Sequence, residues 1–305
     1  MTPSPAMGAP ADAPSPRSGR NLPAAIGIGL LLGGLVVGTL FLAEPLFIVV
    51  VITAMAWGAV ELYRAAGATE ARIRRGVMSA VVGIIAVLLA AALAGATGMM
   101  LAFAAAFLIG AVLRLRGGPD GYLADIGLLS FTLAYLGVLP GFVMLLLRHA
   151  DGQQWVFVFI ALTVANDVGG YAVGALFGRH KVAPALSPSK SWEGLVGSLI
   201  AQVAVGCWLF PALLGLPWWL GGIVGVLLTA VATTGDVLES AIKRDAGVKD
   251  SGNSLPGHGG ILDRLDSLLP NAAAAYLIVV LLDLATERLG ADLRAGDWVG
   301  LLPLG

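Results

Sequence analysis

The sequence predicts an all-α, polytopic integral membrane protein. Hydrophobic residues fill 58% of its 305 positions and only 12% are charged, whereas soluble globular proteins are roughly 45–50% apolar. The mean hydropathy is +0.89. Apolar stretches of about 20 residues recur along the chain, each long enough to cross the hydrocarbon core as a helix. The 42 glycines agree with this class, because small residues let membrane helices pack closely.

Nine transmembrane helices are predicted from these stretches. They are residues 23–42, 45–63, 77–95, 97–113, 122–147, 154–177, 193–214, 217–239 and 268–286. The 122–147 span is the least regular, because it carries Asp125 and a Leu139-Pro140-Gly141 break. Residues 1–22 are rich in Pro, Ala and Ser and predict a disordered tail. This tail is not a signal peptide, because the apolar run after Arg20 is too long and no small-residue cleavage site follows it. One membrane domain is expected over 23–290, followed by a short tail at 291–305.

The distribution of positive charge predicts how the chain is oriented. With the N-terminus inside, the inner segments hold fifteen of the eighteen lysines and arginines, and the outer segments hold Arg148, Arg288 and Arg294. Basic residues are retained on the cytoplasmic side of a membrane. We therefore expect a cell-membrane protein whose two most basic loops, 178–192 and 240–267, both face the cytoplasm. The net charge of −1 identifies no partner by itself, and no nucleic-acid partner is predicted.

The stretch Gly235–Ser267 concentrates charge in a chain that otherwise avoids it. It holds five aspartates, a glutamate, four basic residues and His258. Asp236, Glu239 and Ser240 are spaced i, i+3, i+4 and share one helical face. Carboxylate oxygens without cysteine suit Mg²⁺, and intermixed basic residues suit phosphates. A salt-bridged cytoplasmic loop is the alternative reading of the same residues.

A second polar region precedes it. Asp167 lies within the 154–177 span, where a charge is costly and usually paired or in a wet cavity; a helix–helix anchor is the alternative. The loop that follows offers Arg179, Lys181 and Lys190 as phosphate donors and Ser191 as a cap for a helix beginning at Trp192. The alternative is that this loop is basic only because basic residues are retained on the cytoplasmic side of the membrane.

These two regions resemble the phosphatidate cytidylyltransferase family, the CDP-diacylglycerol synthases. The residues that carry the resemblance downstream are Ser240, Lys243, Arg244, Lys249, Asp250, Gly252, the turn Pro256-Gly257-His258-Gly259-Gly260, Asp263, Arg264 and Asp266. Those upstream are Asp167, Tyr171, Gly178, Arg179 and the run Ser187–Gly194. Two positions depart from the family pattern: Ser189 stands where lysine or asparagine is common, and Gly170 where alanine is usual.

The resemblance implies transfer of a cytidylyl group from CTP to phosphatidic acid, with Mg²⁺ as cofactor. It implies catalytic roles for Asp236, Lys243, Asp263 and Asp266, with Asp236 and Asp263 as the principal metal ligands. The residues expected to bind substrate are Asp167, Arg179, Ser187, Lys190, Ser240, Arg244, Lys249, Asp250, His258, Gly259, Gly260 and Arg264. The role of His258 stays open between a phosphate donor, a general acid and a turn residue.

Two other functions are weighed against this one. The first is a membrane enzyme that uses CTP on another lipid, such as a polyprenol-type kinase or an isoprenoid-ether lipid cytidylyltransferase. The second is an ion-coupled transporter that relays ions through Asp125, Asp167 and Asp236. The other predicted partners are membrane lipids and a second copy of the chain in a homodimer.

Overall fold

The computed structural model describes residues 22–67, 70–183, 187–248, 251–252 and 260–289, so nearly all of both predicted tails falls outside it. Within these ranges the protein is helical apart from one short hairpin. The elements are α1 Leu22–Leu42, α2 Glu44–Ala65, α3 Glu70–Leu115, α4 Tyr122–Leu133, η1 Ala134–Val138, α5 Leu139–Leu147, α6 Gly152–Phe177, β1 Lys181–Ala183, β2 Ser187–Ser191, α7 Trp192–Leu209, η2 Phe210–Leu214, α8 Trp218–Asp245, η3 Leu262–Arg264 and α9 Leu268–Leu289.

The helices follow the predicted spans closely. Among the described residues, seven helical segments are long and apolar enough to cross a membrane, and α1 adds the shorter apolar stretch Gly29–Leu42. The longest, Gly76–Leu115, covers two predicted spans. It breaks at Gly95, where φ is 72° and ψ is −160°. A Cβ built on Gly83 would lie 3.0 Å from the Cβ of Ala106, so the two halves fold back against each other, and the predicted division near residue 96 is confirmed.

Two π-helical turns interrupt the remaining spans, and each is associated with a proline. The turn η1 comes just before Pro140, and η2 contains Pro211. Proline has no backbone N–H and its ring crowds the carbonyl four residues earlier, so the local hydrogen bonding must rearrange. The sequence predicted a break at Leu139–Gly141; the structure instead widens the turn at Ala134–Val138 and continues the helix to Leu147.

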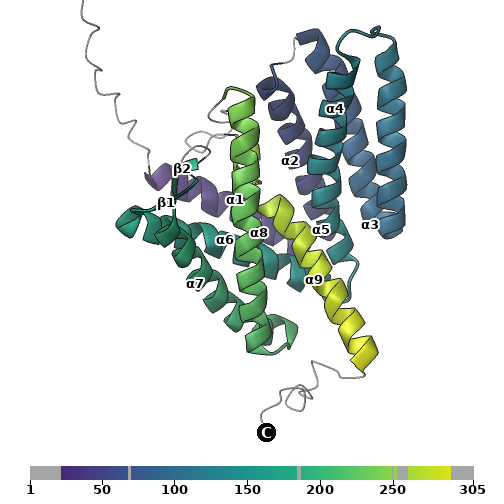
Figure 1. The fold of residues 1–305 in the computed structure, drawn as a ribbon. Helices are drawn as coiled ribbons and strands as arrows, with labels where there is room; N and C mark the ends of the chain where they lie inside the picture. The colour runs from purple at the N-terminus through teal and green to yellow at the C-terminus, as the bar shows by residue number, and fades with distance from the viewer. Residues whose placement is uncertain (1–21, 68–69, 184–186, 249–250, 253–259, 290–305) are drawn as a thin grey trace, which may run out of the picture.

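The helices form two groups with α9 between them (Figure 1). Helices α2 to α5 pack together in the first group, and α6, α7 and α8 with the hairpin make up the second. Helix α9 contacts α5, α6 and α8, so it joins both groups. The first turn of α9 therefore lies beside the last turns of α8, where the polar residues of the 235–267 stretch are found.

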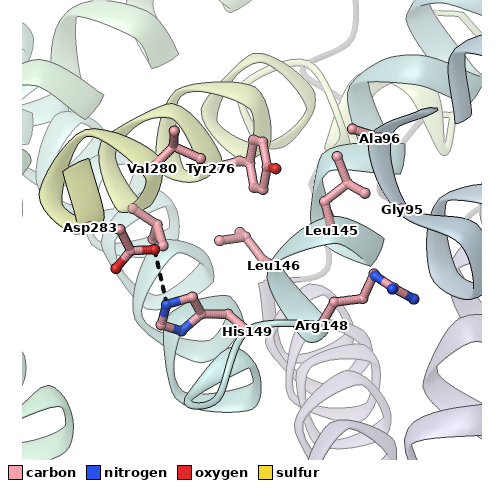
Figure 2. A pocket seen from close by; sticks show the side chains of 10 residues that line it. Gly95, Ala96, Leu145, Leu146, Arg148, His149, Tyr276, Val280 and Asp283 are labelled. Carbon is pink, nitrogen blue, oxygen red and sulfur yellow. Dashed lines mark ion pairs between the residues drawn. The ribbon is translucent and has the colours of Figure 1, made fainter. Parts of the chain in front are cut away.

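A cavity of about 270 Å³ lies near the other end of α9, beside the break in α3 (Figure 2). Arg148 donates from Nη1 to the carbonyl oxygen of Ala92 at 2.6 Å, which satisfies an acceptor freed by the break at Gly95. His149 Nε2 lies 3.3 Å from Asp283 Oδ2. Tyr276 also lines the cavity and follows Leu268 by eight residues, so about 12 Å of helix separates the cavity from the start of α9.

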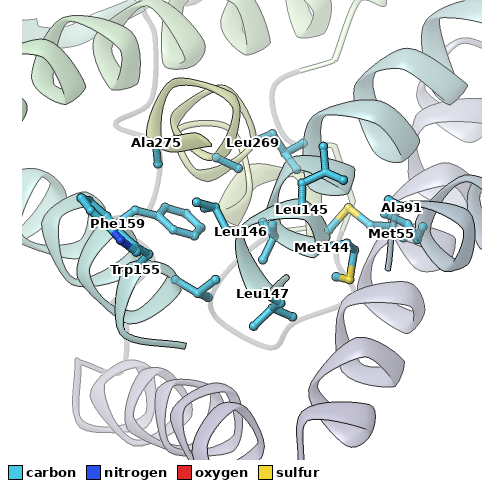
Figure 3. Close-up of a cluster of buried hydrophobic side chains, with 14 of the residues drawn as sticks. Met55, Ala91, Met144, Leu145, Leu146, Leu147, Trp155, Phe159, Leu269 and Ala275 are labelled. Carbon is cyan, nitrogen blue, oxygen red and sulfur yellow. The ribbon is translucent and has the colours of Figure 1, made fainter. Parts of the chain in front are cut away.

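The hydrophobic core is centred on α5 (Figure 3). Its residues Met144–Leu147 are buried between Trp155 and Phe159 of α6 and Leu269 and Ala275 of α9. Many large apolar side chains on the outer surface are exposed instead, among them Leu93, Val168 and Ile200. Such a surface is expected for helices solvated by lipid tails, and the core therefore serves to align the helix ends that carry the polar residues.

Close glycine contacts bring the second group of helices together. A Cβ on Gly169 of α6 would lie 2.5 Å from the carbonyl oxygen of Gly197 in α7, and one on Gly221 of α8 would overlap the carbonyl oxygen of Gly206 in α7. Backbones approach this closely only where both side chains are absent. These crossings fix how the ends of α6, α7 and α8 meet.

Replacing Gly221 with leucine is expected to lower the free energy of unfolding by about 3 kcal/mol. The added side chain would meet the α7 backbone, which cannot move aside as a flexible side chain would. The measurement is the apparent unfolding midpoint in detergent, followed by tryptophan fluorescence. Gly127→Ala in α4 is the control, because a Cβ there meets nothing within 4 Å. Equal midpoints for the two variants would show that the α7–α8 crossing does not depend on this contact.

Candidate active site

The polar residues predicted to act together come from two helices and two connecting segments. The C-terminal ends of α6 and α8, the hairpin before α7, and the 260–267 segment before α9 all lie at one end of the second helix group. Gly235 makes this meeting close, because a Cβ there would lie 2.5 Å from the carbonyl oxygen of Asp266 and from Pro270. Asp236 is thereby placed next to the segment that carries Asp263 and Asp266.

Asp263 is the centre of the first cluster of contacts. Its Oδ2 accepts hydrogen bonds from the backbone N–H groups of Gly260 at 2.8 Å and Ser251 at 3.1 Å. Its Oδ1 accepts from Ser251 Oγ at 3.0 Å and from Lys243 Nζ at 2.9 Å. Lys243 also pairs with Glu239, which is 4% exposed and one helical turn earlier on α8. The carboxylate of Asp263 therefore joins α8 to the segments on both sides of the 253–259 stretch.

Lys190 is the centre of the second cluster. It comes from β2 and forms an ion pair with Asp236 of α8, which lies 46 positions later in the sequence. Asp266, Asp167 and Glu239 are the other acids whose charges act on its ammonium group. The structure thus brings one lysine from the upstream motif near acids from α6, α8 and the segment before α9.

The environment shifts the ionisation of these groups in opposite directions. Burial raises the pKa of Asp266 to about 6, although its hydrogen bond from the Ser267 N–H opposes the shift. Burial acts the same way on Asp263, but the hydrogen bonds from Gly260 and Lys243 outweigh it and hold the pKa of that carboxyl below its ordinary value. Burial lowers the pKa of the Lys190 ammonium, and the facing acids Asp266 and Asp167 partly offset this. Asp263 is therefore more firmly ionised than Asp266.

The hairpin that carries Lys190 is fixed by Glu193 in the first turn of α7. The Glu193 carboxylate accepts from the backbone N–H of Arg179 at 3.1 Å and of His180 at 3.2 Å, and its Oε1 lies 2.6 Å from His180 Nδ1. Ser191 caps α7 as predicted, accepting at Oγ from the Gly194 N–H at 3.1 Å. The sequence reading expected only a basic loop here and missed the antiparallel pairing of Lys181 with Ser191 and of Ala183 with Ser187.

Asp167 is held at the junction of α6 and α7. Asn166 donates to its Oδ1 at 3.2 Å, and the Asn166 carbonyl accepts from Ser198 Oγ at 2.7 Å. A Cβ on Gly170 would lie 2.5 Å from Ser198 Oγ. This contact accounts for glycine at 170, where the family usually has alanine, because Ser198 fills the space that a methyl group would need.

The remaining predicted residues divide into three sets. Ser240 is half-buried on α8, Gly260 is buried, and Arg179, Arg244 and Arg264 are exposed around the two clusters. Ser187 begins β2, and its side chain is not described. The predicted roles of Lys249, Asp250, His258 and Gly259 lie outside the described residues. Asp125, which the transporter hypothesis needs, forms an ion pair with Arg114 between α3 and α4.

Two buried polar residues of the first helix group, Glu61 and Tyr135, were not among the predicted residues. Glu61 of α2 is 2% exposed and accepts a hydrogen bond at Oε2 from the backbone N–H of Leu262 at 3.1 Å. Tyr135 lies in the π-turn η1 and is 9% exposed, and its hydroxyl has no hydrogen-bond partner within the described ranges. A lone glutamate near the end of an apolar span was the available signal for Glu61. Its contact, 201 positions away, could not be read from the sequence.

Mg²⁺ is the cofactor that the resemblance implies, and the donors agree with it in chemistry. Asp236 and Asp263 offer carboxylate oxygens, the ligands that Mg²⁺ prefers. In the part of the chain that the structure describes, no group of three or more His, Cys, Asp or Glu side chains is placed to hold a metal ion. Each aspartate instead pairs with a lysine. This set fits an ion that takes one or two carboxylates and completes its shell with water and substrate phosphates, as Mg²⁺ usually does.

Comparison with known proteins identifies the family of this chain. The model of the cytidylyltransferase family matches residues 23–282, which include all of the described site residues. The phosphatidate cytidylyltransferase of Mycobacterium tuberculosis H37Rv is 36% identical over 279 residues, covering 87% of this chain and 84% of that protein. That of Mycobacterium leprae is 36% identical over 291 residues, covering 88% and 90%. That of Staphylococcus haemolyticus is 39% identical over 146 residues, covering 48% and 55%. Because the family model and the mycobacterial relatives span most of its length, the chain belongs to the cytidylyltransferase family of membrane enzymes.

Proposed function

We propose that this enzyme transfers the cytidylyl group of CTP to phosphatidic acid, forming CDP-diacylglycerol and pyrophosphate. The observation that carries the proposal is the pairing of Lys190 with Asp236 and of Lys243 with Asp263 at one end of a membrane-embedded helix group. Such a site presents both charges that a metal–nucleotide needs, and it lies where a lipid substrate can reach it without leaving the bilayer. The names of the mycobacterial relatives support the choice of lipid.

The chemistry requires positioning and charge neutralisation more than a reactive side chain. A phosphate oxygen of the lipid forms a bond to the α-phosphorus of CTP while the bond from that phosphorus to the bridging oxygen breaks, and the electron pair leaves with pyrophosphate. The nucleophile therefore belongs to the substrate. Phosphoryl-transfer enzymes of this kind work mainly by orienting the reacting groups and stabilising charge.

Two lysines suit this role. Lys190 and Lys243 each pair with a carboxylate, and phosphate oxygens are equally suitable acceptors for their N–H groups. Asp236 and Asp263 would hold Mg²⁺, with Asp266 and Asp167 as further acids nearby. When bound, the ion supplies positive charge to the phosphates. Arg179, Arg244 and Arg264, exposed at the rim, extend the positive surface available to CTP.

The orientation follows from the charge distribution. We place the site on the cytoplasmic side of the cell membrane, where CTP is available, because fifteen of eighteen basic residues fall on that side in the predicted topology. Exposed Tyr171 and Trp192 flank the site at the ends of α6 and α7, and such side chains favour the membrane–water interface. Formation of a homodimer is a separate prediction, measured by light scattering of the detergent-solubilised enzyme.

The decisive experiment incubates the purified protein with CTP, Mg²⁺ and phosphatidic acid. Pyrophosphate and a CDP-lipid in equal amounts are expected, with neither formed when phosphatidic acid is omitted. Formation of CDP and a lipid phosphate from a polyprenol would identify a kinase instead. Ion flux through proteoliposomes without CTP would support the transporter hypothesis. Either of these results, without CDP-lipid, contradicts the proposal.

Cytidylyl transfer is expected to require a divalent ion. Excess chelator should remove at least about 99% of the activity, since the reacting phosphates would lose their main source of charge neutralisation, and Mg²⁺ added above the chelator should restore it. Pyrophosphate release is the measurement, with chelator already saturated by Mg²⁺ as the control. Full turnover in free chelator would disprove the metal assignment for Asp236 and Asp263.

A further inference from the structure

Glu61 occupies an unusual position for a carboxylate. It lies near the end of α2, in a predominantly apolar span, and is 2% exposed. A buried carboxylate in a membrane helix is costly unless strong hydrogen-bond donors surround it. Glu44, the other acid of α2, is at the opposite end of the same helix and is only partly buried. The buried Glu61 carboxylate therefore needs hydrogen-bond donors that offset its loss of hydration.

One such partner is the backbone of the segment before α9. Leu262 donates its N–H to Glu61 Oε2 at 3.1 Å. A Cβ on Gly260 would lie 2.6 Å from the same oxygen, and one on Gly252 would lie 2.8 Å from Oε1. The two glycines thus let their main chains lie directly against the carboxylate. A larger residue at either position would have to displace it.

Glu61 and Asp263 hold the same segments from different helices. Asp263 accepts from the N–H groups of Gly260 and Ser251. Glu61 accepts from the N–H of Leu262 and lies against Gly260 and Gly252, the residue after Ser251. The Leu262 side chain is 4% exposed and packs where Gly58, one turn before Glu61, leaves room: a Cβ on Gly58 would lie 3.6 Å from it. Helix α2 is thus fitted to this segment by both a charge and an apolar contact.

We propose that Glu61 is a positioning residue for cytidylyl transfer, holding the Gly260–Leu262 backbone so that Asp263 faces Lys243. It acts through that backbone and does not itself touch substrate. Through Glu61 the first helix group takes part in the reaction, although every residue of the motifs that carry the resemblance lies in α6 or later. It rests on the proposed function for the identity of the substrates, and on the contacts above for the role of Glu61.

The test compares Glu61→Gln and Glu61→Ala with the parent enzyme. Glutamine keeps the shape and one oxygen acceptor but loses the charge that strengthens the hydrogen bond; alanine removes the acceptor. We expect kcat/KM for CTP to fall about tenfold in Glu61→Gln and about 100-fold in Glu61→Ala, the loss that a misplacement of about 1 Å produces. The unfolding midpoint of Glu61→Gln should match the parent. Glu44→Gln is the matched control and should keep parental activity.

A second measurement separates this inference from the choice of substrate. Hydrogen–deuterium exchange of the amides at 260–262 should be faster in Glu61→Ala than in the parent or in Glu44→Gln, while exchange in α9 stays unchanged. If the parent makes no CDP-lipid but exchange at 260–262 responds in this way, the proposed function fails and the contact stands. Parental exchange and parental kcat/KM in a folded Glu61→Ala would overturn the inference. So would a loss of activity in Glu61→Gln that only follows a loss of folded protein.

Discussion

Asp263→Asn is expected to lower the turnover of CTP about 10³-fold, while the protein still inserts and folds. Both carboxylate oxygens accept hydrogen bonds: Oδ1 from Lys243 and from Ser251 Oγ, and Oδ2 from the backbone N–H groups of Gly260 and Ser251. Asparagine replaces one of these oxygens with an NH₂ group, which would point a donor at donors. It also removes the negative charge that faces Lys243. The measurement is Mg²⁺-dependent pyrophosphate release by the purified variant.

The control for this change is Asp245→Asn. Asp245 is exposed at the end of α8, so the substitution removes the same charge from the same end of the molecule and should leave turnover near the parental value. Size-exclusion behaviour and the unfolding midpoint show whether each variant is folded. If folded Asp263→Asn consumes CTP at a near-parental rate, Asp263 has no place in the chemistry proposed here.

Lys190→Met is expected to have the second largest effect, lowering kcat/KM for CTP by about 10²-fold to 10³-fold. Methionine retains the length of the side chain but removes the ammonium group that pairs with Asp236. The acids Asp236, Asp266 and Asp167 would then face one another without that cation, and the incoming phosphates would lose a donor. Steady-state kinetics with CTP varied at saturating phosphatidic acid measure the effect.

Lys181→Met on the other strand of the hairpin is the matched control. Lys181 is exposed and pairs through its backbone with Ser191, so the substitution removes a basic residue from the same hairpin without touching the acidic cluster. Its kcat/KM should stay within about threefold of the parent. Equal losses in the two variants would mean that general positive charge on the hairpin matters and that the Lys190–Asp236 pair has no special role.

Much of the fold could be predicted from the chain because the relevant signals are local. The boundaries of α2, α6, α7 and α9 lie within a few residues of the predicted spans, and the break in α3 is at Gly95. The length and hydrophobicity of an apolar run determine whether that segment is stable as a helix in lipid. The hairpin at 181–191 was not foreseen, because its strands are too short to show an alternating pattern.

The sequence indicated which polar residues gather in the candidate site but not how they pair. The motif residues Asp236, Lys243 and Asp263 were identified from their spacing and charge, and the structure brings them to one end of the helix group. That Asp236 pairs with Lys190 and Asp263 with Lys243 depends on which helix ends meet. Glu61 was missed because nothing near it in the sequence resembles a site.

The sequence by itself determined that this protein spans a membrane, roughly where each span begins and ends, and which charged residues are concentrated outside the spans. These properties follow from the hydrophobicity of short segments, which the chain carries whatever its tertiary structure. Only the tertiary structure decided that Lys190 meets Asp236 and that Glu61 meets Leu262, 201 positions away. The physical reason is that such contacts depend on the close glycine crossings between helices, and a crossing is a property of two segments that neither segment shows alone.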